Sequence, residues 1–255
     1  MEILGLLGQE SVYKFILLFA RISGLVAFFP FFNHMRIPIV VKTSIVLLLT
    51  LFLTPYATVT VLPHEMVSIT FAITMELMLG FIAGLLAYLV FAALEIAGQQ
   101  ISFVMGFTMA SVIDPQTGVN TPLVSQVFTM LALVLFLALD GHHLILLFYH
   151  HSLGEIPLGS FYPTANMWSY IAKAVMSMFL FGFILSFPIK ALSLLSDIIF
   201  GMLMKTMPQF NLLVVGFPIK IMLSYVAMIA SLGSIMIIFK KEIFKVLNDL
   251  ALLFF

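Results

Sequence analysis

Residues 66–94 read MVSITFAITMELMLGFIAGLLAYLVFAAL, a continuous apolar stretch whose single charged residue is Glu76. About 20 apolar residues in a helix cross the hydrocarbon core of a bilayer, so this stretch is long enough to span a membrane. Five further stretches of this kind lie at 11–32, 41–62, 122–148, 166–198 and 209–239. Their long, unbroken character argues against the alternating strands of a membrane barrel. We therefore predict an all-α integral membrane protein with about six apolar helical blocks.

The composition of the 255 residues supports this class, since 63% are apolar and 9% are charged, with 11 basic and 11 acidic side chains. Soluble domains have about a quarter of their residues charged. The excess of apolar residues therefore excludes a soluble enzyme and a disordered linker, and the lack of a basic stripe excludes a nucleic-acid binder. The chain contains no cysteine, which rules out disulfides and thiolate sites. Its first ten residues carry two glutamates and no basic region, so we expect no cleaved signal peptide.

Two prolines indicate that the blocks are not simple straight crossings. As one helix, block 166–198 would be about 50 Å long, well beyond a bilayer core. Pro188 lies inside this block and Pro218 lies inside 209–239, each within the tetrapeptide Phe-Pro-Ile-Lys. Proline removes a helix hydrogen bond and forces a kink. We predict kinked helical hairpins at both sites.

Charged residues inside the apolar blocks also favour helices that are partly shielded from lipid. These residues are Arg21, Glu76, Lys173, Lys190 and Lys220. Each would cost roughly 2.5–3.5 kcal/mol at a helix centre facing lipid, so we expect them to face protein or a water-filled path. For Glu76 there are two interpretations, an internal ion pair with a buried base or a proton relay. The ion pair is the favoured one.

The positions of basic residues do not fit six crossings. Arg36 and Lys42 place the first loop in the cytoplasm, and Lys205 does the same for the fifth. The acidic loop 140–155 is then outside, but six crossings would also leave the three lysines of 240–245 outside. We expect a hairpin in place of one crossing.

The segment 98–122, GQQISFVMGFTMASVIDPQTGVNTP, resists assignment to a simple helix. It is apolar as far as Ile113, and Asp114-Pro115 then begins a series of turn residues. One interpretation is a turn between helices, with ordinary core methionine and phenylalanine side chains, and composition alone favours it. The other is a mobile apolar seal that closes a pore by excluding water.

Other polar motifs carry weaker signals. Histidines and nearby carboxylates between 140 and 155 could supply ligands for a divalent metal, but zinc ligands normally converge from separate elements, so we predict no metal site. The histidines are His142, His143, His150 and His151.

Gly80 and Gly84 form a GxxxG motif that permits close helix packing. No nucleophile–base pair or phosphate-binding motif appears in the sequence, so we predict a non-enzymatic protein without a cofactor.

Short motifs then follow one another in a fixed order along the chain. They are Arg21 with Pro30, Ile37-Pro38 with Lys42, Ala97-Gly98, Met105-Gly106, Ala110, Asp114-Pro115, Pro122, Met130-Leu131-Ala132, Leu135-Phe136-Leu137, Gly141-His142, Ile156-Pro157-Leu158-Gly159, and Pro208-Gln209 with Gly216-Phe217-Pro218. This order resembles the R-subunit family of the bacterial flagellar type III secretion export gate, whose injectisome homologues are the T subunits.

The resemblance implies a subunit of a hetero-oligomeric gate in the bacterial inner membrane, within the flagellar basal body. With P- and Q-type subunits and the larger export apparatus, such a gate passes unfolded flagellar proteins across the membrane. The resemblance further implies a P-like part at 1–165 and a Q-like part at 166–255. Alternatives are an injectisome gate subunit, or a small-solute or metal transporter using Glu76 and the histidine pairs.

The family's R subunit contributes a loop that plugs the closed channel. Carried onto this sequence, that loop lies within 101–121 and raises the seal interpretation above the turn. The matching positions are Met105, Gly106, Phe107, Met109, Asp114 and Pro115.

Overall fold

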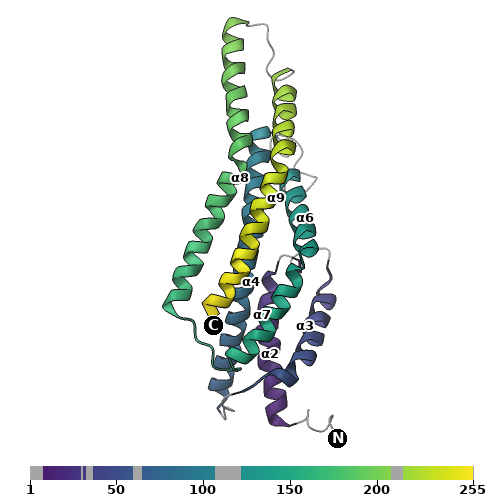
Figure 1. Ribbon diagram of the computed structural model, residues 1–255, viewed down its shortest axis with the longest axis vertical. Helices are drawn as coiled ribbons and strands as arrows, with labels where there is room; N and C mark the ends of the chain where they lie inside the picture. Colours follow the sequence, from purple (N-terminus) through teal and green to yellow (C-terminus); the bar gives the residue numbers. More distant parts are fainter. Residues whose placement is uncertain are drawn as a thin grey trace. The chain divides into compact units, whose positions relative to one another are not determined.

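The computed structural model describes residues 8–29, 31–32, 37–59, 65–106, 122–207 and 215–254, and these residues are almost entirely helical (Figure 1). The helices are α2 (Gln9–Phe28), α3 (Ile39–Leu53), the short 3₁₀ helix η1 (Thr54–Tyr56), α4 (Met66–Met105), α6 (Leu123–Ala138), α7 (Gly141–Glu155), α8 (Ala165–Thr206) and α9 (Phe217–Phe254). Within the described ranges, strand-type pairing is limited to one isolated bridge, between Val59 and Leu158. The all-α prediction is confirmed.

Five of these helices are long and apolar enough to cross a membrane, and α6 with α7 adds a sixth candidate if the bent pair is one span. The block predicted to end at residue 94 continues as α4 to Met105, so the first part of the 98–122 segment is helix. Gly98 does not end this helix, because it serves close packing: a Cβ added there would overlap the backbone of Ser125. The prediction that segment 98–122 is not part of a simple helix is therefore wrong for residues 98–105.

The block predicted at 122–148 is two helices that meet at an angle of 63°. The break falls at Asp140, whose φ of 56° lies in the left-handed region that aspartate adopts more readily than most residues. Helix α7 runs from Gly141 to Glu155. These residues are therefore helical and do not form the acidic loop that was predicted at 140–155.

The two prolines occupy different helical environments. Pro188 lies inside α8, which continues for 42 residues, longer than the block predicted at 166–198. Pro218 is the second residue of α9, and Val215 and Gly216 directly before this helix are π-helical. Pro218 therefore lies near the start of the described part of this helix, and its predicted place inside 209–239 stays a prediction because 208–214 lie outside the described residues.

The chain divides into two compact units, each assembled from separated segments. Unit 1 comprises Met1–Leu89, Phe136–Ala174 and Ile243–Phe255, and its most buried side chains include Leu17, Leu18, Leu79, Ile82 and Leu86. Unit 2 comprises Val90–Leu135 and Val175–Glu242, with a core that includes Phe91, Leu94, Ile101, Phe128 and Phe239. The division into P-like and Q-like parts at residue 165 rests on the resemblance and stays a prediction.

Candidate functional site

The first candidate site is a buried ion pair in unit 1. Arg21 on α2 and Glu76 on α4 make two contacts, Nε to Oε2 at 2.5 Å and Nη2 to Oε1 at 3.1 Å. Neither side chain is exposed at all. This is the internal ion pair that the sequence analysis set against a proton relay for Glu76.

Small residues let the two helices approach closely enough for this pair to form. A Cβ on Gly80 of α4 would overlap the carbonyl oxygen of Arg21, and a Cβ on Gly24 of α2 would overlap that of Leu77. Gly84, one turn further along α4, faces the backbone of Leu25 in the same way. Close approach of backbones through small residues is the usual mode of helix packing in membranes. The packing role predicted for the GxxxG motif is confirmed.

The remaining hydrogen-bonding groups of the pair are satisfied by α7 and the turn that follows it. Arg21 Nη1 donates to the carbonyl and hydroxyl oxygens of Ser152, at 3.2 and 3.3 Å, and Nη2 donates to the carbonyl of Ile156 at 3.1 Å. The N–H of Gly159 donates to Glu76 Oε1 at 2.7 Å, and the Tyr149 hydroxyl donates to the Arg21 carbonyl at 3.2 Å. A buried pair is stable when its spare donors and acceptors find partners, as they do here.

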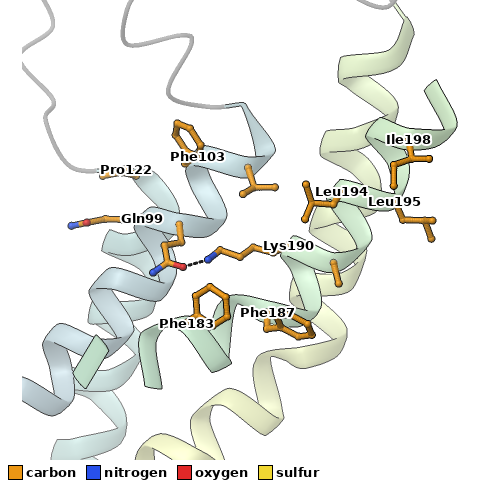
Figure 2. A pocket seen from close by; sticks show the side chains of 12 residues that line it. Gln99, Phe103, Pro122, Phe183, Phe187, Lys190, Leu194, Leu195 and Ile198 are labelled. Carbon is orange, nitrogen blue, oxygen red and sulfur yellow. Dashed lines mark hydrogen bonds between the residues drawn. The ribbon is translucent and has the colours of Figure 1, made fainter. Parts of the chain in front are cut away.

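The second candidate site lies in unit 2, around Lys190 of α8. Its ammonium group donates to Gln100 Oε1 on α4 and lies 4.3 Å from the centre of the Phe183 ring. The Ser186 hydroxyl donates to the same Gln100 oxygen at 3.1 Å. These groups face a groove of about 1040 Å³, and Figure 2 shows Lys190 reaching across it from α8 towards α4.

Lys220, in the repeated tetrapeptide, has a different partner. Its ammonium group binds both carboxylate oxygens of Asp197, at 2.7 and 2.8 Å, within unit 2. The Lys220 side chain is 12% exposed and that of Asp197 is 49% exposed. Of the charges predicted to be shielded, Arg21 and Glu76 are fully buried, Lys190 and Lys220 are half-buried, and Lys173 is exposed.

The histidines separate into two groups. Asp140, His142 and His143 bring their donor atoms within 4.8 Å of one another, while His150 packs against the ring of Tyr56. Asp140 and His143 are exposed, and the three donors come from the residue that precedes α7 and from the first turn of this helix. The positive end of a helix disfavours a cation, so this cluster is better explained as a polar bend than as a metal centre.

The predicted plug lies mostly outside the described residues. Met105 ends α4 with its side chain fully buried, and Gly106 follows with a φ of 86°. A Cβ on Gly106 would touch the ring of Phe217 in unit 2. The other predicted plug residues, Phe107, Met109, Asp114 and Pro115, lie outside the described residues.

Sequence reasoning missed Tyr149, Ser152 and Gln100 as parts of these sites. Tyr149 and Ser152 lie 128 and 131 positions from Arg21, and no local pattern signals such a contact. Gln99-Gln100 was detectable, because two amides in an otherwise apolar helix require partners.

Long apolar helices, joined through small residues around a fully hydrogen-bonded ion pair, define a multi-pass α-helical membrane protein. Residues 12–246 match the profile of the bacterial export proteins, family 1, and the chain belongs to this family. The family resemblance drawn from the sequence is confirmed.

Three relatives, each named flagellar biosynthetic protein FliR, illustrate the similarity. The one from Bacillus subtilis is 33% identical over 232 residues, which is 89% of either chain. The one from Pectobacterium carotovorum is 32% identical over 210 residues, covering 82% of this chain and 80% of the relative. The one from Escherichia coli is 26% identical over 234 residues, covering 90% and 89%.

Proposed function

We propose that this chain is a component of the flagellar protein-export apparatus in the bacterial inner membrane, where it helps to form and seal the channel for unfolded flagellar proteins. The observation that carries this proposal is the family match over residues 12–246, together with three FliR relatives aligned over more than four fifths of this chain. Each of those relatives carries the flagellar name, which favours a flagellar gate over the injectisome alternative.

The exposed apolar surface supports a role within an assembly. In the most apolar windows of α8 and α9, 28% and 11% of the residues are buried. The rest of this surface needs lipid or other subunits against it, because exposing apolar side chains to water costs free energy. We assign part of that surface to P- and Q-type neighbours in the gate.

The proposed role is non-enzymatic. Glu76, the fully buried carboxylate of unit 1, accepts hydrogen bonds from Arg21 and Gly159 and has no adjacent nucleophile among the described residues that bind it. A general base must reach the proton that it removes, whereas this carboxylate is enclosed by its structural partners. Glu76 therefore serves to hold α2, α4 and the turn after α7 together.

Assembly into the export apparatus is tested by expressing the chain with P- and Q-type subunits and isolating a complex through a tag on this chain. Stable co-purification, with loss of flagellar secretion when the gene is deleted, is the expected result. A soluble, stable monomer that binds neither the P-type nor the Q-type subunit would contradict the proposed role in a multi-subunit assembly.

Sealing is tested separately, by shortening 106–112 in cells in which the complex still assembles. We expect the shortened chain to leak ions or small molecules through the closed channel. The matched control replaces His150 and His151 by glutamine, which leaves segment 101–121 intact. If the shortened chain assembles and the cells stay tight, segment 101–121 is not the seal.

A further inference from the structure

The groove beside Lys190 has apolar walls that the described residues leave uncovered. On α8 the wall includes Phe187, Leu194 and Ile198, each more than half exposed, and Phe103 of α4 stands opposite at 70% exposure. All of the lining residues belong to unit 2. An apolar groove with a volume of about 1040 Å³ can receive several side chains of a ligand or a partner.

Among the described residues, no carboxylate balances the charge that Lys190 brings into this groove. The described residues contain four ion pairs, and Lys190 belongs to none of them. Its ammonium group has three donors, of which one goes to the neutral Gln100 and another side of the group faces the Phe183 ring. A cation at this place in an apolar helix is unfavourable until it meets an acceptor with negative charge.

The residues of α8 that line the groove follow the spacing of a helix ridge. Phe183, Phe187, Lys190, Leu194 and Ile198 recur every three or four residues and line the same groove. The ridge extends over 15 residue steps, or about 22 Å of helix. This is the length over which two packed helices interdigitate their side chains.

We propose that this groove receives an apolar helix of another gate subunit, and that a carboxylate midway along that helix binds Lys190. The inference rests on the proposed function, since it requires that the chain work inside a multi-subunit assembly. It names the chemistry of the partner surface: apolar side chains at helical spacing on both sides of one aspartate or glutamate.

The position of the charge favours a helix over a phospholipid. Along α8, Lys190 lies between Phe183 and Phe187 on one side and Leu194 and Ile198 on the other (Figure 2). A phospholipid carries its charge at one end of its acyl chains, so a lipid held by Lys190 would fill only one half of the groove. A helix places a charged side chain between apolar ones and fills both halves.

The test uses photo-crosslinking of the full-length chain in the assembled export complex. A photo-reactive phenylalanine analogue replaces Leu194, which lines the groove, or Met176 as the matched control, which is 74% exposed on α8 but does not line it. We expect the Leu194 probe to form an adduct with an apolar helical segment of another subunit that contains aspartate or glutamate. The Met176 probe should give a different adduct or none.

Charge complementarity is tested in the same complex. Lys190→Glu should lower the yield of the Leu194 adduct by about tenfold or more, because like charges then face each other. Lys190→Arg should preserve the adduct, and exchanging the partner carboxylate for lysine should restore it in the Lys190→Glu chain. Rescue by the second change shows that the first variant folds.

Three outcomes overturn the inference. They are an adduct with phospholipid alone, an adduct with another segment of the same chain, and an adduct that is unchanged in Lys190→Glu. Failure of the complex to form with the wild-type chain would contradict the proposed function itself, whereas a stable complex with a lipid adduct would contradict only the occupant of the groove.

Discussion

The carboxylate of Glu76 on α4 binds the guanidinium of Arg21 on α2 at 2.5 and 3.1 Å, with both side chains completely removed from solvent. The bidentate geometry matches the fork of the guanidinium and is stronger than a single contact. Because α7 and its following turn also bind the pair, unit 1 depends on it at three places in the chain.

Replacing Glu76 by glutamine should destabilise the chain by about 3–5 kcal/mol, because it leaves a buried guanidinium without its anion. The measurement is the thermal stability of the purified complex in detergent. Glu10→Gln is the matched control, since Glu10 pairs with Lys14 at 2.6 Å but is 58% exposed. A surface pair of this kind contributes about 0–1 kcal/mol.

The double variant Arg21→Met, Glu76→Met gives an independent check of the pair. It should be destabilised by less than the sum of the two single methionine variants, because neither charge is then left alone. Additive effects would show that the two side chains act separately.

Gly80→Ala should destabilise the chain by about 1–3 kcal/mol, since the added methyl group overlaps the backbone of Arg21 and forces α2 away from α4. Gly233→Ala in α9 is the matched control, because a Cβ there meets nothing within 4 Å. Removing glycine from a helix interior favours the helix by about 0.5–1 kcal/mol. Equal melting temperatures for the two variants would contradict the close crossing of α2 and α4.

Pro188→Ala and Pro218→Ala should have unequal effects. Proline inside a helix is unfavourable by about 3 kcal/mol relative to alanine, whereas proline in a first turn is tolerated. We therefore expect Pro188→Ala to raise the thermal stability of the complex and Pro218→Ala to change it little. A larger gain from Pro218→Ala would mean that proline at position 218 blocks a backbone hydrogen bond that alanine can make.

Replacing His142, His143, His150 and His151 together by glutamine should leave flagellar secretion within about twofold of wild type, because a ring contact such as that of His150 with Tyr56 contributes only about 0.5–1.5 kcal/mol. Zinc titration of the purified complex, with and without the four substitutions, checks the metal-transporter alternative. Tight zinc binding that disappears with the histidines, accompanied by loss of secretion, would contradict a purely structural bend at Asp140.

The fold was predictable from the sequence where local chemistry decides it. Long apolar runs predicted the helices, and the expense of a charge in lipid predicted that Arg21 and Glu76 are shielded. The same reasoning failed at Gly98, because its need for space comes from Ser125, which is distant in the chain. It also failed at Asp140, where a single left-handed residue divides one apolar block into two helices.

The candidate sites were less accessible to sequence reasoning. Lys190 was recognised as a shielded charge, but its partner Gln100 lies 90 positions away. The predicted plug came from the family resemblance and remains a prediction, since composition alone favoured an ordinary turn. Contacts between distant helices follow from tertiary packing, and one sequence does not encode them in a local pattern.

The hydrogen bond from Gly159 to Glu76 has a consequence for how the chain is made. Its two residues are 83 positions apart, which corresponds to roughly 4–17 seconds of synthesis at about 5–20 residues per second. During this interval Arg21 and Glu76 have been translated, while Gly159 has not. A nascent chain that ends before residue 159 therefore lacks the Gly159 donor and has an incomplete set of hydrogen bonds around Glu76.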